Sequence, residues 1–202
     1  MIAIIDYDAG NIKSVEKAMT LLGQEAIITR DKNIIMSADH VILPGVGNFK
    51  DAMGKLEHYE LVPIIEDVCK KGTPFLGICL GLQLMFENSE EAPNVKGLSL
   101  LKGSIVKIPE GEYKKIPHMG WNNLTLKGDG RLFNGIESDP YVYFVHSFYL
   151  KAEDEKIVKA TTEYNVIIHA SVEKDNIFAC QYHPEKSSDA GLKMLKNFIE
   201  IK

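Results

Sequence analysis

The sequence is poor in cysteine, in clustered positive charge and in long apolar runs, and each shortage excludes a class of protein. Its three cysteines, Cys69, Cys79 and Cys180, include no Cys-x-x-Cys pair, so they indicate neither a disulfide framework nor a zinc site. The 23 lysines and arginines are scattered and the net charge is -5, which argues against nonspecific nucleic-acid binding. No apolar run reaches the roughly 20 residues of a membrane helix, and residues 1–6 lack the basic flank and apolar length of a signal peptide. We therefore expect a cytoplasmic protein that binds neither nucleic acid nor membrane.

The remaining composition is that of an ordinary globular domain of 202 residues, 45% hydrophobic and 25% charged. The first half alternates short apolar runs with amphipathic helical patterns, and Gly72 is placed to cap one of these helices. The runs cover residues 3–5, 40–43 and 74–76, and the helical patterns cover residues 11–19 and 60–71. Such alternation predicts an α/β fold, with a mostly parallel sheet and helices on both faces.

The second half has a different pattern, with β-like runs separated by turn residues. These runs cover residues 104–108, 141–145, 157–161, 166–170 and 177–181, and a closing helix is expected over 190–201. They predict hairpins or a mixed sheet that extends the first one. Because there is no repeat and no linker, we expect one domain over residues 1–202.

One thiol, Cys79, is placed on a turn between an apolar strand and a helical pattern, in Gly77-Ile78-Cys79-Leu80-Gly81. This is the arrangement of a nucleophile elbow, in which a sharp turn lifts the reactive side chain off the carboxyl edge of a sheet. The N–H groups of the following helix would favour the thiolate, and the N–H of Leu80 would face a developing oxyanion. A buried cysteine at a tight turn is the alternative, and the pentapeptide alone does not choose between them.

A cysteine nucleophile needs a base, and His183-Pro184-Glu185 follows the last predicted strand. Pro184 favours an extended segment, in which residues two apart share a face. Glu185 would then hold one imidazole nitrogen of His183 while the other meets Cys79. A surface turn is the alternative. Four other histidines have no partner by spacing and are expected to be hydrogen-bonded structural residues: His40, His58, His146 and His169.

These motifs together resemble the triad-type, or class I, glutamine amidotransferases over nearly the whole chain. The similarity includes Gly77 to Gly81, Gln83 and His183-Pro184-Glu185. Four further segments resemble the glutaminase subunits of imidazole glycerol phosphate synthases: residues 6–11, 44–49, 117–122 and 144–148. The resemblance implies a flavodoxin-like class I amidotransferase fold with an added antiparallel or mixed β portion in the second half. It implies no cofactor and no metal ion.

The resemblance also implies roles for individual residues. Cys79 would attack the carboxamide of glutamine, His183 would protonate the leaving ammonia and then activate water, and Glu185 would orient His183. The oxyanion donors would be the N–H groups of Leu80 and, after a peptide flip, Val46. Glutamine would be held by Gly47, Gln83, Ser147 and Phe148. Without the resemblance, residues 44–47 indicate a simple turn, because a phosphate loop would need a third glycine and a lysine.

A partner is expected because ammonia released into water at neutral pH is mostly protonated and no longer nucleophilic. The resemblance implies that the acceptor is a cyclase subunit, a (β/α)₈ barrel of the histidine pathway that forms a heterodimer with the glutaminase. The implied interface residues are Asn11, Pro117, Met119, Trp121, Asn122 and Lys186. A core strand is the alternative for Trp121, and the interface is favoured because Pro117 and Gly120 would break a regular strand.

Two residues depart from the common pattern of the family. Asp8 stands where glycine is frequent, which questions unusual backbone angles there, and Phe148 stands where tyrosine is common. Three rival hypotheses remain: a paralogous amidotransferase subunit feeding another synthase, for example in surface-sugar amidation; a cysteine hydrolase or peptidase without a partner; and a non-catalytic binding subunit. The complete set of Cys79, His183 and Glu185 argues against the last.

Overall fold

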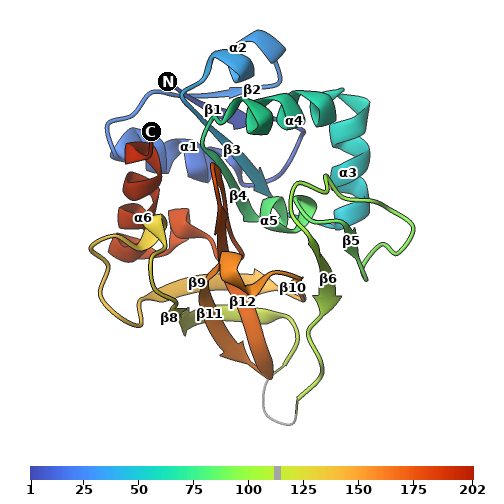
Figure 1. Cartoon of the computed structure of the whole chain (residues 1–202), viewed down its shortest axis with the longest axis vertical. Coiled ribbons are helices and arrows are strands. Elements are labelled where there is room, and N and C mark those ends of the chain that lie inside the picture. The colour runs from blue at the N-terminus through green and yellow to red at the C-terminus, as the bar shows by residue number, and fades with distance from the viewer. Residues whose placement is uncertain (112–114) are drawn as a thin grey trace.

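The computed structural model describes residues 1–111 and 115–202, and in this part of the chain the main sheet has eight strands (Figure 1). Their order is β2-β1-β3-β4-β13-β12-β11-β8. The parallel strands are β1 (Ile2–Ile5), β2 (Ala26–Thr29), β3 (His40–Gly45), β4 (Phe75–Cys79) and β13 (Ile177–Cys180). The antiparallel extension is formed by β12 (Val166–Lys174), β11 (Val158–Tyr164) and β8 (Thr125–Leu126). The predicted fold class is therefore confirmed.

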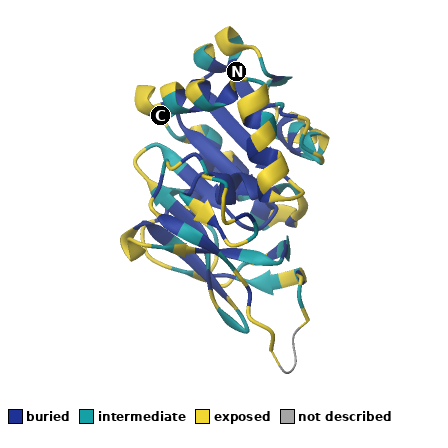
Figure 2. Ribbon diagram, turned by 90° about the vertical axis from the view of Figure 1, so that its right-hand side faces the viewer, coloured by how far each residue is buried: buried dark blue, intermediate teal, exposed yellow. Residues whose placement is uncertain are grey.

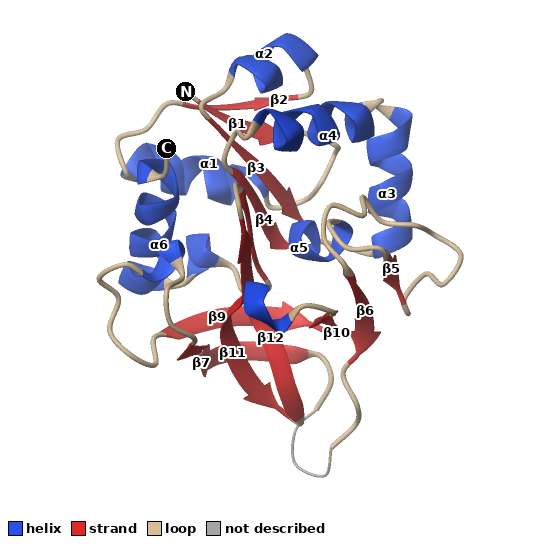
Figure 3. Ribbon diagram, viewed as in Figure 1, coloured by secondary structure: helices blue, strands red, loops and turns tan. Residues whose placement is uncertain are grey.

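Helices cover both faces of the parallel sheet (Figure 3). One face packs on α1 (Ile12–Leu21) and α6 (Ser188–Glu200). The other packs on α2 (Lys32–Ser37), α3 (Phe49–His58), α4 (Leu61–Lys71) and the short α5 (Leu80–Leu84). Alternate residues of β1 show this division, because Ile2 and Ile4 belong to the first core and Ala3 and Ile5 to the second. Buried strands with exposed helical outer faces are visible in Figure 2.

Two smaller sheets lie beside the antiparallel extension (Figure 1). One is a two-stranded ribbon of β7 (His118–Asn123) and β9 (Tyr141–His146). The other contains β10 (Phe148–Ala152), β6 (Gly103–Lys107) and β5 (Asn88–Ser89). Single turns of 3₁₀ helix occur at η1 (Arg131–Phe133), η2 (Glu155–Ile157) and η3 (Pro184–Lys186).

The expectation that Pro117 and Gly120 would break a strand is wrong. Strand β7 pairs with β9 from His118 to Asn123, because Pro117 precedes the first paired residue and its missing N–H removes no ladder bond. Gly120 stays in the ladder at a φ of 124°, a conformation that glycine adopts without strain.

Several elements were not predicted from the sequence, among them β2, α2 and α3. The two helices nevertheless carry N-terminal caps. In α2 the Asp31 carboxylate accepts a hydrogen bond from the N–H of Ile34, and in α3 the Asn48 side chain accepts one from the N–H of Asp51. The predicted cap of α4 is confirmed, with Gly72 in the left-handed conformation. In the described residues, no helix combines the length and apolar character needed to cross a membrane.

Candidate active site

Cys79 ends strand β4 on a strained turn. Its φ of 55° and ψ of −109° lie outside the regions that most non-glycine residues adopt, and α5 begins at the next residue. The flanking glycines are required by close packing: a Cβ on Gly81 would lie 1.9 Å from the carbonyl oxygen of Leu43, and one on Gly77 would lie 2.4 Å from the sulfur of Met85. The turn predicted from the sequence is therefore wedged against strand β3.

His183 reaches the same sheet edge because β13 lies next to β4, with Cys180 opposite Ile78. Its Nδ1 atom is 2.8 Å from Oε1 of Glu185, and both side chains are buried. Its Nε2 atom makes no hydrogen bond of regular geometry within the described chain and is left for the Cys79 sulfur.

The expected extended segment at His183-Pro184-Glu185 is wrong. Pro184 begins a turn of 3₁₀ helix, closed by the N–H of Lys186 donating to the carbonyl of His183 at 3.0 Å. Proline suits this first position because its missing N–H would have no partner there. The imidazole and the carboxylate therefore meet across a helical turn instead of on one face of a strand.

Burial and the neighbouring charges act on the pKa of His183 in opposite directions. Burial lowers its pKa, but the Cys79 sulfur and the Glu185 carboxylate on either side more than offset burial and raise the pKa to about 10. The two flanking groups thus favour the imidazolium form of His183. By contrast, burial raises the pKa of Cys69 to about 12 and raises that of Cys180 as well, so these two thiols stay protonated.

A cavity of about 430 Å³ opens over Cys79 and His183, a size typical of small-molecule sites. The structure brings every predicted oxyanion and glutamine-site residue to its wall: Val46, Gly47, Leu80, Gln83, Ser147 and Phe148. The backbone carbonyl oxygen of Phe148 accepts a hydrogen bond from Gln83 at 3.1 Å. Because this contact uses the backbone, it does not depend on whether residue 148 is phenylalanine or the tyrosine common in the family.

Two further wall residues, Glu91 and His146, were not predicted as site residues. Glu91 presents a carboxylate, one oxygen of which accepts from the N–H of Phe49 at 2.8 Å. It lies in a connecting segment that has no periodic hydrophobic pattern. His146 is hydrogen-bonded at the end of β9, as expected, to the carbonyl of Phe148 at 2.8 Å and to His118 at 3.0 Å. Burial lowers the pKa of His146 to about 4, so its ring is neutral.

The loop of residues 6–11 contacts both the triad and the segment of residues 44–47. Asn11 donates to Oε1 of Glu185 at 2.8 Å, so this residue, predicted to face a partner, also touches the acid of the triad. The hydroxyl of Tyr7 donates to the carbonyl of Pro44 at 2.8 Å. The position of this loop therefore affects both sides of the site.

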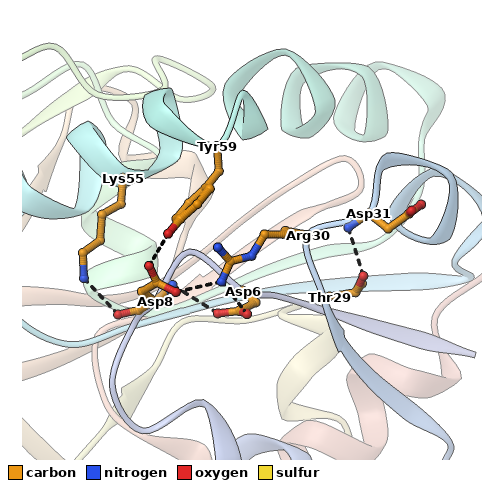
Figure 4. Close-up of polar contacts among 7 residues, drawn as sticks. All are labelled: Asp6, Asp8, Thr29, Arg30, Asp31, Lys55 and Tyr59. Carbon is orange, nitrogen blue, oxygen red and sulfur yellow. Dashed lines mark hydrogen bonds and ion pairs between the residues drawn. The ribbon is translucent and has the colours of Figure 1, made fainter.

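A polar cluster on Asp8 holds that loop from outside (Figure 4). The carboxylate of Asp8 accepts from Arg30 at 2.7 Å and from the Tyr59 hydroxyl, while Lys55 donates to its carbonyl at 3.0 Å. Those two hydrogen bonds, with Tyr59 and then Arg30, lower the pKa of Asp8. Asp8 has a φ of 60°, so the doubt about unusual backbone angles at this position is wrong. We call Asp8, Arg30, Lys55 and Tyr59 the Asp8 clamp.

The remaining predicted interface residues lie around the mouth of the site and on the β7–β9 ribbon. Pro117 lines the cavity, Lys186 is exposed beside Glu185, and Asn122 donates to the carbonyl of Glu163 at 3.1 Å. Met119 and Trp121 are 62% and 54% exposed, so Trp121 is no core residue. In the described residues, no three side chains of His, Cys, Asp or Glu are grouped so as to hold a metal ion.

Comparisons with known proteins agree over the whole length. The family model for glutamine amidotransferase class-I matches residues 3–201. The chain is 53% identical over 200 residues to imidazole glycerol phosphate synthase subunit HisH of Bacillus mycoides, covering 98% of this chain and 93% of the relative. It is 49% identical over 201 residues to the HisH subunit of Caldanaerobacter subterraneus, covering 100% and 98%. The structure of PurLQS from Thermotoga maritima shares the fold, with a TM-score of 0.76 at 21% identity over 98% of this chain and 96% of that one.

Proposed function

Because the chain belongs to the class I glutamine amidotransferases, we propose that it is the glutaminase subunit of an imidazole glycerol phosphate synthase, which hydrolyses L-glutamine and passes on the ammonia. The observation that supports the chemistry is the meeting of a strained Cys79 with the buried His183–Glu185 pair at one wall of the cavity. The full-length similarity to HisH subunits supports the pathway. We also propose that residues 1–202 act as one domain, in the cytoplasm.

The reaction runs through a thioester. The Cys79 sulfur attacks the carboxamide carbon, and the oxyanion that forms accepts hydrogen bonds from the N–H of Leu80 and, after a peptide flip, of Val46. His183 protonates the nitrogen, the C–N bond breaks and ammonia leaves. His183 then takes a proton from water, which attacks the thioester and releases glutamate and the thiolate. Glu185 keeps the imidazole in the orientation that both steps need.

The cavity wall accounts for recognition of the rest of the substrate. The Glu91 carboxylate supplies a negative charge for the α-ammonium group of glutamine, and Gly47, Ser147 and Phe148 line the rest of the space that the substrate would fill. Gln83 supports this wall from behind, since its amide donates to the Phe148 carbonyl.

The partner is the cyclase subunit, a (β/α)₈ barrel, in a heterodimer. We propose that the cyclase binds to strands β7 and β9, which expose Met119, Trp121 and Tyr141. We call these two strands the docking ribbon. Exposed Trp, Tyr and Met are residue types enriched at protein interfaces. We include Asn11, Pro117, Asn122 and Lys186 in the proposed interface around this surface. A paralogous subunit for surface-sugar amidation is the second candidate, and the HisH relatives favour the histidine pathway.

Reconstitution with the histidine-pathway cyclase tests this function. We expect Cys79→Ala to abolish formation of imidazole glycerol phosphate from glutamine, and to leave formation from added ammonium salt near the wild-type rate. Cys69→Ala is the control and should leave the glutamine reaction intact. If the Cys79→Ala complex forms imidazole glycerol phosphate from glutamine at the wild-type rate, the proposed role of Cys79 is contradicted. A wild-type chain that neither binds nor serves this cyclase would contradict the pathway.

A further inference from the structure

Gln181 is a buried side chain at the reactive sulfur, outside the triad and the oxyanion donors. It directly follows strand β13 and is fully buried beside Cys79. Its Nε2 atom donates toward Sγ of Cys79 at 3.7 Å, a hydrogen-bond distance for sulfur. Its Oε1 atom accepts from Nε2 of Gln83 at 3.0 Å. The amide of Gln181 is therefore held at both ends.

A backbone carbonyl fixes which end of the amide faces the sulfur. The Phe148 carbonyl only accepts, and it receives hydrogen bonds from Gln83 at 3.1 Å and from His146 at 2.8 Å. Gln83 must therefore turn its NH₂ group to Phe148, and the same group donates to Gln181. Gln181 must in turn present its oxygen to Gln83, which leaves its NH₂ group pointing at Cys79. The opposite amide orientation would place two acceptors or two donors against each other.

The other neutral titratable groups around the sulfur do not supply this donor. The hydroxyl of Tyr7 donates to the carbonyl of Pro44, and burial raises its pKa, so it stays protonated and turned away. Burial likewise keeps the Cys180 thiol protonated by raising its pKa. His183, oriented by Glu185, is the charged partner of the sulfur, and it gives its proton away during the reaction.

We propose that Gln181 is a catalytic residue that donates a fixed amide N–H to the Cys79 sulfur and stabilises it as the thiolate. This rests on the proposed function of Cys79. The contribution falls at two points: before attack on the carboxamide, and when the thioester C–S bond breaks and its electron pair returns to sulfur. A hydrogen bond to an ion is stronger than one between neutral groups, and more so in a buried site. At the second point His183 holds the proton that it took from water, and Gln181 donates to the sulfur alongside it.

The test replaces the amide by an apolar side chain of similar length. In Gln181→Met we expect alkylation of Cys79 by iodoacetamide at neutral pH to slow by about 10-fold, as loss of a hydrogen bond to a charged group predicts. With the cyclase bound, kcat for glutamine should fall by a similar factor while KM changes little. Gln24→Met, at an exposed glutamine, is the matched control and should change neither quantity.

A second variant covers the case in which Gln181→Met does not fold. Gln181→Glu keeps the shape and an oxygen for Gln83, but it offers the sulfur a negative charge, so both rates should fall further than in Gln181→Met. Wild-type alkylation in either folded variant would overturn the inference, as would a loss confined to KM, which indicates a structural role. Cys79→Ser separates the two proposals, because glutamine hydrolysis by that variant would overturn the proposed function instead.

Discussion

The parallel sheet and the docking ribbon differ in how far their apolar side chains are buried. In the parallel sheet both faces are covered, and Phe75 and Phe178 are fully buried between the layers. In the ribbon only one face is covered: Phe144 is fully buried, whereas Trp121 and Tyr141 are 54% and 62% exposed on the other side. The parallel region is thus complete in the isolated chain, and the ribbon leaves apolar area for a second protein.

This difference has a consequence for the chemistry. The elbow needs a rigid setting because Cys79 holds a strained conformation, and the packing of β3 against α5 supplies it. The ribbon reaches the same cavity, which His146 at the end of β9 and Pro117 just before β7 help to line. A partner bound to the ribbon would therefore contact elements that also line the cavity over Cys79.

The largest expected effect compares two aromatic residues on the two faces of the ribbon. Phe144→Ala should lower the free energy of unfolding by about 3–5 kcal/mol, because it leaves a cavity in the core. Trp121→Ala should change it by only about 0.5 kcal/mol, yet weaken cyclase binding by about 2 kcal/mol or more. Thermal unfolding and a binding titration measure the two quantities. A strongly destabilised Trp121→Ala chain that still binds its cyclase normally would show that the docking surface is elsewhere.

The next effect tests the packing of the elbow. Gly81→Ala should destabilise the chain by about 3 kcal/mol and remove glutaminase activity, because its Cβ would lie 1.9 Å from a backbone oxygen in β3. Gly54→Ala is the control within helix α3, where a Cβ meets no atom within 4 Å, and it should stabilise the chain by about 0.5–1 kcal/mol. Chemical denaturation of both variants checks the contrast. Equal stability of the two would mean that the turn is not wedged as described.

The smallest effect concerns the Asp8 clamp. Asp8→Ala should reduce kcat by only about 2- to 5-fold, since exposed ion pairs contribute little. Asp8→Gly should be milder, because glycine adopts the positive φ without strain. Asp129→Ala removes another exposed ion pair, with Lys159, and should leave kcat unchanged. Steady-state glutaminase assays that show identical losses in all three would exclude a role of the clamp in positioning Asn11.

The sequence predicted the parts of the parallel half whose periodic signals are strong, but it missed β2, α2 and α3. The glycines around Cys79, the capping Gly72 and the apolar runs all reflect local geometry that the fold keeps. The ribbon was harder, because Pro117 and Gly120 suggested a break that depends on register and not on composition. Contacts between residues far apart in the sequence could not be predicted from local patterns. His118 contacts His146, and Gln181 contacts Cys79, only because distant strands pair as they do.

The central claim is that Cys79 becomes covalently acylated during turnover at the fixed elbow. Acid quenching of the complex during glutamine turnover, followed by mass spectrometry of the peptide that contains Cys79, measures this directly. The account predicts a glutamyl adduct on Cys79, absent in Cys79→Ala and strongly reduced in His183→Ala, which cannot protonate the leaving nitrogen. A turning-over enzyme that carries no adduct on Cys79, or carries it on Cys69 or Cys180, would contradict the account.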